Sequence, residues 1–379
     1  MNRREHIDRS RRGLLTAAAG MSAAVLVNDL FAPGLARAEA AADPRVARLI
    51  ARNITLDMHN HVKWAFIKPP AEMKPFPDID IPGQMKKAGL SALCYCYCVD
   101  DYRQAQPGDF YQYHLQSLDY VDWLLARTGM RRAYTLADVR NAHRRKQPII
   151  IQNVEGAQFL EGHLERVEEA YKRGLRHMQL LHQMHDLVAP LGDLQNNEPA
   201  KFGGLTPFGA DVIRECNRLG IVVDLAHAHE STVMAALKVA TQPLVVSHTA
   251  LNSPTGRGVT SDSLSVRLAS REYAKAVAAA GGVVGVWHLY RTTKDYVAEI
   301  REMLDLVGID HVGIGSDSEM APSPQQQLLT NNMWPDEGNA FLYAVVGEML
   351  AQRFTEAEIT KVVGGNYCRV FDKVTARRA

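Results

Sequence analysis

The feature of this chain that most limits its fold is a pattern that recurs eight times after residue 45. In each repeat an apolar, often β-branched run ends in polar residues, and an amphipathic helical segment follows. The runs are ITLDMHNH, ALCYCYCV, PIIIQNVEG, HMQLLHQ, IVVDLAHAH, PLVVSHT, GGVVGVWHL and HVGIGSDS. Continuous apolar runs are typical of strands buried on both faces of a parallel sheet. Their alternation with helices predicts an α/β protein, a single-domain (β/α)₈ TIM barrel with its active site at the C-terminal ends of the strands.

Three of the intervening helices have readable ends. They span residues 163–174, 206–220 and 295–308, and each closes with a glycine. Thr206 is the expected N-cap of the second helix, and Asp295 is the expected N-cap of the third. The alternative fold is a doubly wound open sheet, but such sheets usually carry a glycine-rich phosphate loop after an early strand, and this sequence has none.

Composition and charge narrow the function class. The chain has 379 residues, of which 46% are hydrophobic and 22% charged, as in ordinary soluble globular proteins. Its formal net charge is +1, without an acidic or basic tail, so nucleic-acid binding through bulk electrostatics is not expected. The segment 62–82, rich in proline and lysine, is expected to form a long loop over the top of the barrel.

The N-terminal residues have the pattern of an export signal. SRRGLLT, at residues 10–16, contains the twin arginines Arg11 and Arg12, and an apolar run follows. The ARA at 36–38 predicts cleavage after Ala38. We therefore interpret residues 1–38 as a twin-arginine signal peptide and 39–379 as the barrel, in a periplasmic or secreted protein. The alternative is an amphipathic N-terminal helix. No later segment is apolar for long enough to span a membrane.

The ends of the predicted strands carry histidines and carboxylates. Because these ends converge at one mouth of a barrel, unpartnered polar groups there would be costly, and a bound metal would satisfy them. His59 and His61 lie two residues apart in an extended run, so both rings should reach one ion. The alternative is that only His59 is a ligand. The strand-end residues are His59, His61, Glu155, His182, His227 (with His229), His248, His288 and Asp317.

Four histidines and one glutamate predict two metal ions with Glu155 as the bridge. Two divalent ions can share a hydroxide and lower the pKa of bound water. Nitrogen and oxygen ligands without cysteine favour Zn²⁺, with Co²⁺ or Mn²⁺ as alternatives. Asp317, on the last strand, is a natural proton shuttle to a leaving amine. The predicted metal ligands are His59, His61, Glu155, His227 and His248.

The CYCYC run at 94–98 has two interpretations. With a period of two, Cys94, Cys96 and Cys98 share one face of a strand, and Tyr95 and Tyr97 share the other. The run could be a thiolate metal site. We favour a buried strand with small apolar thiols, because three cysteines spread along one strand form too long a line for tetrahedral zinc.

In several of these segments the chain resembles the membrane (renal-type) dipeptidases, a branch of the metal-dependent amidohydrolase-like barrels. The resemblance runs from about residue 45 to 372. It rests on NVEGAQFL, GLRHMQLLH, GLTPFGADVIRECNRLGIVVDLAHAHESTV, PLVVSHTA, GIGSD and GGNYCRVF, in this order.

Together with the export signal, the resemblance implies an exported binuclear zinc dipeptidase, in which a metal-bridging hydroxide attacks the amide of a dipeptide. It also implies roles: His182 polarises the scissile carbonyl, Asp317 is the acid/base carboxylate, and Arg257 grips the substrate's C-terminal carboxylate. A solvated loop charge is the alternative for Arg257. Glu155 matches the bridge, His59 the first-strand ligand, and His227 and His248 the pair at the second zinc. Members commonly form homodimers.

Two departures from the family pattern affect the substrate. The family usually has His-x-Asp where this chain has His59-Asn60-His61, so a neutral ligand replaces an anionic one. The family also tends to place a tyrosine near the substrate at the seventh strand, where this chain offers His288 and Tyr290, and Tyr290 is our candidate. Hydrolysis of another small amide or a lactone is therefore the alternative function, and a non-catalytic periplasmic metal-binding protein is a further one.

Overall fold

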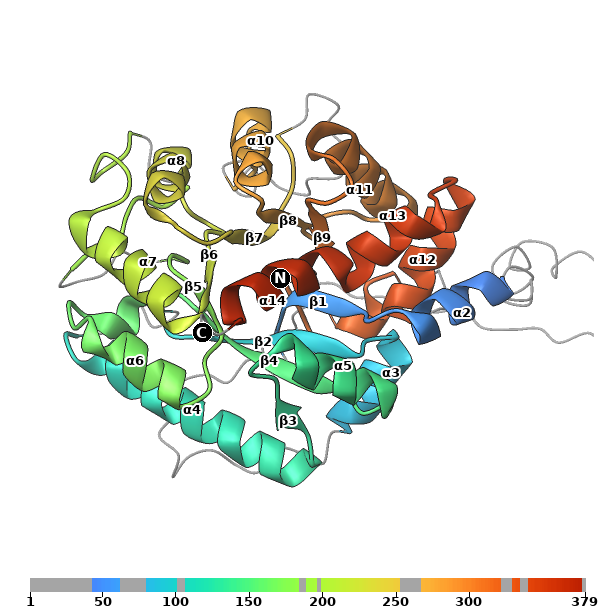
Figure 1. The fold of residues 1–379 in the computed structure, drawn as a ribbon, viewed down its shortest axis with the longest axis horizontal. Helices are drawn as coiled ribbons and strands as arrows, with labels where there is room; N and C mark the ends of the chain where they lie inside the picture. Colours follow the sequence, from blue (N-terminus) through green and yellow to red (C-terminus); the bar gives the residue numbers. More distant parts are fainter. Residues whose placement is uncertain are drawn as a thin grey trace, which may run out of the picture. The chain divides into compact units, whose positions relative to one another are not determined.

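A computed structural model describes residues 43–61, 80–100, 106–183, 189–195, 199–252, 267–321, 329–334 and 340–376. The predicted signal peptide, residues 1–38, lies outside these ranges. A ten-stranded sheet forms the centre of the fold (Figure 1). Its strands are β1 (Leu56–His61), β2 (Ala92–Cys98), β3 (Arg131–Arg132), β4 (Ile149–Glu155), β5 (His177–Gln179), β6 (Val222–Asp224), β7 (Val245–Thr249), β8 (Val283–Val286), β9 (Val312–Ile314) and β10 (Ser318–Glu319).

The sheet is parallel throughout and returns to its first strand. Its order is β10-β1-β2-β4-β5-β6-β7-β8-β9, with the short β3 beside β4. β9 pairs with β8, and β10, only a few residues further along the chain, pairs with β1. Each of the eight predicted runs contains a strand. The predicted α/β class and the curled parallel sheet are confirmed, and the arrangement is consistent with a TIM-like barrel.

Helices follow most strands and surround the sheet (Figure 1). In the described ranges none of them is both long and apolar enough to cross a membrane. They are α2 (Pro44–Arg52), α3 (Ile81–Ala88), α4 (Asp109–Thr128), α5 (Leu136–Arg144), α6 (Glu165–Lys172), α7 (Pro207–Leu219), α8 (Glu230–Val239), α10 (Arg271–Ala279), α11 (Thr293–Val307), α12 (Phe341–Ala351), α13 (Glu356–Thr360) and α14 (Asn366–Thr375).

The predicted helix ends are partly right. Thr206 caps α7 as expected, because its side chain accepts a hydrogen bond from the Gly209 N–H at 3.1 Å. The prediction of Asp295 as the N-cap of α11 is wrong. Thr292 is the cap, since its extended backbone lets its hydroxyl accept from the Asp295 N–H, while the Asp295 carboxylate accepts from that hydroxyl.

The predicted loop at 62–82 extends too far. Its last two residues are wrong, because α3 already begins at Ile81, with Asp80 as its cap and Pro82 in its first turn. Residues 62–79 lie outside the described residues.

The fold has two apolar cores, and the polar side chains at the carboxyl ends of the strands belong to neither. The larger core lies between the sheet and the surrounding helices and includes Tyr95 and Tyr97 of β2. The smaller core contains Leu56, Cys94 and other residues from the beginnings of the strands, packed against α14 and α5. α14 contacts β6, β8 and β9 and covers these amino ends (Figure 1). The carboxyl ends of the strands therefore carry the side chains that neither core takes up.

Candidate metal centre

β1 brings both of its histidines to the centre through an irregularity that the sequence pattern did not reveal. Leu56 and Met58 point into the small core. Between Asp57 and Asn60 the register against β2 shifts by one residue, so β1 contains one extra residue there. Such bulges re-aim side chains, and here the residue after Met58 turns inward as well. His59 and His61 are fully buried, with their Nε2 atoms 3.3 Å apart.

Two carboxylates face this histidine pair. His59 Nε2 lies 3.6 Å from Glu155 Oε1 and 3.6 Å from Asp317 Oδ1. His61 Nε2 lies 3.4 Å from Glu155 Oε2 and 3.4 Å from the same Asp317 oxygen. One side chain comes from the end of β4 and one from the turn after β9. Four side chains of metal-ligand type therefore converge at the carboxyl ends of β1, β4 and β9.

Glu155 also faces a second group of imidazoles. Its Oε1 lies 3.4 Å from His182 Nε2 and 3.6 Å from His227 Nε2. His227 Nε2 is in turn 2.9 Å from His248 Nε2. Ligand atoms of His59, Glu155, His248 and Asp317 also lie within 4.8 Å of one another. The structure thus brings together every predicted ligand, with Glu155 at the junction of the two groups.

Outer hydrogen bonds hold two of these rings with Nε2 toward the centre. His61 Nδ1 lies 3.2 Å from the Cys96 carbonyl oxygen, and His182 Nδ1 lies 2.6 Å from Asp100 Oδ1. Metal-ligating histidines typically donate their second ring N–H to such an acceptor, which fixes tautomer and orientation. Asp100 is fully buried and also accepts from the Gln183 backbone N–H at 2.8 Å, so it fixes the chain around His182.

The donor set fits divalent cations. Glu155 Oε2 is buried and accepts no hydrogen bond from the described residues, and a buried carboxylate oxygen that accepts none is costly. His227 and Asp317 have φ values of 65° and 49°, in the left-handed region that residues other than glycine seldom adopt. Such strain, worth ~1–3 kcal/mol per residue, is concentrated at functional sites.

The electrostatics of the cluster favour a cation as well. Burial would raise the pKa of Glu155, but His182 and His59 hold it well below its usual value. Burial lowers the pKa of His227 and, more strongly, of His248, so these rings are neutral, as metal ligands are. Burial also acts to lower the pKa of His61, but the Asp317 and Glu155 carboxylates outweigh it and raise the pKa to about 10. A positive charge between the Glu155 and Asp317 carboxylates is therefore stabilised.

Tyr290 and His229 have contacts with residues outside the cluster. Tyr290 is buried, its ring 6.4 Å from that of Tyr296, and its carbonyl accepts from Trp334. His229 is the N-cap of α8, with Nδ1 accepting from the Ser231 N–H. Arg257 lies outside the described residues.

His288 differs from them in its hydrogen bonding. It follows β8 and packs edge-on against Trp334. Both of its ring nitrogens are buried, and neither is hydrogen-bonded to the part of the chain that the structure describes. Burial lowers its pKa to about 4, so the ring is neutral.

Sequence reasoning missed the surroundings of the cluster. All five cysteines are buried, and the three of the CYCYC run lie on a strand, as expected for small apolar thiols. However, Cys96 lies among the possible ligands next to His59, His61 and Glu155, and Cys98 Sγ lies 3.1 Å from both Asp100 Oδ1 and His182 Nδ1. The register of β2 on β4, in which Cys98 pairs with Glu155, puts these thiols at the level of the ligands.

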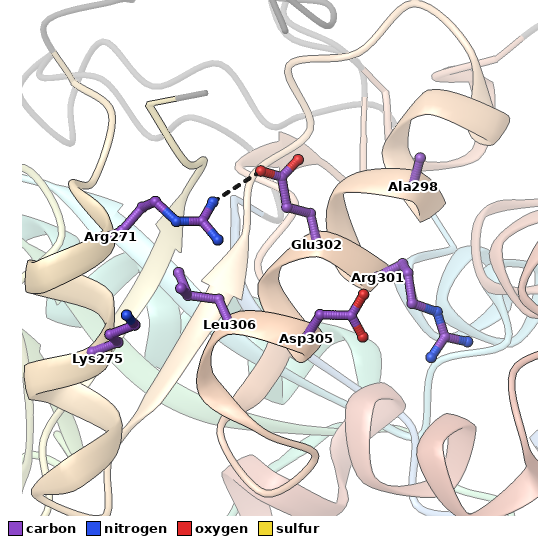
Figure 2. Close-up of a pocket in the computed structure, with 7 residues that line it drawn as sticks. All are labelled: Arg271, Lys275, Ala298, Arg301, Glu302, Asp305 and Leu306. Atoms are coloured by element: carbon purple, nitrogen blue, oxygen red, sulfur yellow. Dashed lines mark hydrogen bonds and ion pairs between the residues drawn. The ribbon is translucent and has the colours of Figure 1, made fainter. Parts of the chain in front are cut away.

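A hollow between α10 and α11 has a different character from the cluster. Figure 2 shows that charged side chains line it, with Arg271 pointing toward Glu302, and their Nη1 and Oε1 atoms are 3.1 Å apart. Both side chains reach solvent, and exposed ion pairs of this kind contribute little energy. We therefore place the candidate site at the strand ends.

Comparison with known proteins agrees with this geometry. The sequence profile of the membrane dipeptidase family (peptidase family M19) matches residues 44–379. The chain belongs to this family. Dipeptidase tcpJ of Claviceps purpurea is 27% identical over 247 residues, which cover 65% of this chain and 55% of the relative. The chain thus matches little more than half of that protein's length.

Two solved structures share the fold. The probable dipeptidase PvdM from Pseudomonas aeruginosa has a TM-score of 0.71 and 17% identity, covering 88% of this chain and 98% of that one. A metallopeptidase from Rhodobacter sphaeroides, solved with a phosphinate mimic of the dipeptide L-Ala-D-Ala, has a TM-score of 0.65 and 19% identity. That match covers 85% of this chain and 99% of the other.

Proposed function

We propose that this protein is an exported dipeptidase that uses two divalent metal ions, Zn²⁺ by preference, to hydrolyse the amide bond of dipeptides. The observation that carries the proposal is the junction at Glu155, where one buried carboxylate faces histidines from both halves of the cluster. Family membership and the dipeptide mimic bound by the Rhodobacter sphaeroides relative support the substrate class. Residues 1–38 support export through the twin-arginine pathway.

The cluster divides into residues that would hold the ions and residues that would act on the substrate. Glu155 would bridge, with His59 and His61 on one side and His227 and His248 on the other. When bound, a pair of divalent ions polarises a carbonyl and lowers the pKa of water. The Nδ1 atoms of His61 and His248 contact the Cys96 carbonyl and the Ser247 hydroxyl, which hold them away from the centre. The Nε2 atoms of these two rings are therefore available for ligation.

His182 and Asp317 would act on the reacting bond. His182 Nε2 faces Glu155, and as an imidazolium, with Nδ1–H donated to Asp100, the ring can also donate from Nε2–H to the oxygen of a scissile carbonyl as negative charge develops there. Asp317 is the least buried of the cluster's side chains, 19% exposed, so it can reach both the centre and an entering substrate. Its carboxylate would take a proton from the attacking water and pass it to the departing amine. Arg257 remains our candidate for the substrate's C-terminal carboxylate, on sequence alone.

The test is a substrate panel applied to the wild type and two matched variants. The panel contains L,L- and L,D-dipeptides, one dipeptide amide, one simple amide and one lactone. Glu155→Gln keeps the shape of the bridge and removes its charge, whereas Glu165→Gln changes a glutamate whose side chain is 67% exposed. We expect dipeptide cleavage by the wild type and by Glu165→Gln, and none by Glu155→Gln. Cleavage of the lactone or simple amide alone would support the alternative substrate class. No cleavage by metal-loaded protein would support the non-catalytic reading.

A further inference from the structure

Ser247 lies between two histidines that belong to different halves of the cluster. It is fully buried on β7, directly before His248. Its Oγ lies 2.9 Å from His248 Nδ1 and 3.4 Å from His59 Nδ1. The two rings are close, with centroids 4.2 Å apart. Their Nε2 atoms nevertheless face different neighbours, since that of His248 faces His227 and that of His59 faces the carboxylates.

A single hydroxyl can set the tautomer of both rings. An imidazole that binds a metal through Nε2 carries its proton on Nδ1, and that N–H needs an acceptor. A serine oxygen has two lone pairs and can accept from both rings at once. We infer that Ser247 is a positioning residue for both halves of the centre, which fixes His59 and His248 with Nε2 free for metal. The inference rests on the proposed function insofar as that function requires two ions.

The strand geometry explains how two consecutive residues both reach the interior. Val245 points into the small core, and Val246 points outward to the helices. Ser247 therefore faces inward by simple alternation. Between Val246 and Thr249 the register against β8 shifts by one residue, which gives β7 one extra residue. This irregularity lets His248 turn inward as well, next to Ser247.

The Ser247 backbone is held on two sides. Its N–H donates to Asp224 Oδ1 at 2.9 Å. Its carbonyl oxygen lies so close to Gly285 and Gly315 that a Cβ at either position would overlap it. A side chain at Gly285 in β8 or at Gly315 after β9 would therefore push the β7 backbone away at Ser247. A hydroxyl on a backbone fixed in this way is a preorganised acceptor rather than a mobile one.

Asp224 is itself fixed from below. Its Oδ2 lies 3.1 Å from His177 Nε2, and His177 Nδ1 lies 2.9 Å from the Tyr367 hydroxyl. All three side chains are buried. A buried polar chain therefore runs from α14, which covers the amino ends of the strands, up to Ser247.

Measuring zinc binding to Ser247→Ala distinguishes a role of Ser247 as hydrogen-bond acceptor for the two histidines from a role in packing alone. We would titrate demetallated protein with Zn²⁺ alone in a calorimeter and fit both binding events. Loss of an outer partner usually weakens metal binding by about 10- to 100-fold. We expect such a loss at both events, because both rings lose their acceptor. The matched control is Thr249→Val, which removes a buried hydroxyl from the same strand that donates to backbone carbonyls. We expect that variant to bind both ions as the wild type does.

Several outcomes would overturn the inference. One is wild-type affinity for both ions in Ser247→Ala, and another is equal weakening in Thr249→Val. If Ser247→Ala does not fold, Ser247→Gly also removes the acceptor without adding a zinc ligand, and wild-type zinc affinity in that variant would also overturn the inference. A wild type that binds only one ion would refute the shared role as well. By contrast, a wild type that binds two ions without cleaving dipeptides would refute the proposed substrate and leave the Ser247 inference standing.

Discussion

The buried Asp224 carboxylate provides the most quantitative stability prediction. It accepts hydrogen bonds from three donors, namely His177 Nε2 at 3.1 Å, the Ala226 N–H at 3.0 Å and the Ser247 N–H at 2.9 Å. In Asp224→Asn the N–H groups of Ala226 and Ser247 would donate to a neutral amide oxygen instead of a charged carboxylate. The hydrogen bond from His177 would also lose its anionic acceptor. Bonds to charged groups are worth ~1.5–3 kcal/mol and neutral ones ~1, so we expect a loss of about 3 kcal/mol.

This loss should depend on pH in a defined direction. Burial alone would raise the pKa of Asp224, but His177 and its other partners hold it below the usual range. A carboxyl whose pKa is depressed by folding stabilises the native state above its unfolded pKa of ~3.9, and this stabilisation is lost as the pH falls toward the folded value. The difference between wild type and Asp224→Asn should therefore be constant from pH 7 to pH 5 and shrink below about pH 4.

The assay is thermal unfolding with excess chelator, so that ion binding does not add to the Tm. At ~2 °C per kcal/mol for a large domain, Asp224→Asn should unfold about 6 °C below the wild type at pH 7. Asp211→Asn, at a side chain that is 54% exposed, is the control and should change little. Equal Tm values for wild type and Asp224→Asn at pH 7 would refute the reasoning, as would a difference that grows in acid.

Three further predictions address the site and export. Asp317→Asn should keep its fold and its metal but lose roughly 10²–10⁴ in kcat, the usual value of general acid–base catalysis, and near-normal turnover would remove Asp317 from the mechanism. His61→Ala should lose one metal equivalent and its activity, whereas His61→Asp should recover metal binding with an altered rate or substrate preference. Two metals and normal turnover in His61→Ala would show that His61 is not a ligand. Replacing Arg11 and Arg12 with lysine should retain the precursor in the cytoplasm, and an unchanged periplasmic yield would exclude the twin-arginine pathway.

The sequence was sufficient for the elements that depend on periodicity. Eight apolar runs correspond to strands, and their polar ends meet because parallel strands end at the same edge. The alternation in β2 correctly put Tyr95 and Tyr97 on one face and the three cysteines on the other, and the structure turns the tyrosine face toward the helices. In contrast, the level of each cysteine in the interior depends on the register between strands, which no single strand encodes. Cys96 and Cys98 were therefore assigned to plain packing.

The local irregularities could not be predicted. The alternation rule correctly predicted that His59 and His61 point to the same side of the strand. It did not reveal the extra residue in β1 that lets Met58 and His59 both face inward. Ser247 and Asp100 were missed for a different reason. Their side chains are common polar groups, and only the fold brings them to the second nitrogen of a histidine. Tertiary neighbours, not residue type, identify such outer partners.

We propose that Glu155 joins two cation positions in one hydrolytic centre. The most direct test of this proposal is stepwise addition of Zn²⁺ to demetallated protein, with bound metal and dipeptide turnover measured on the same samples. We predict two equivalents of bound zinc per chain, with turnover that reaches its maximum only as the second is taken up. Full turnover with a single bound equivalent would contradict the account.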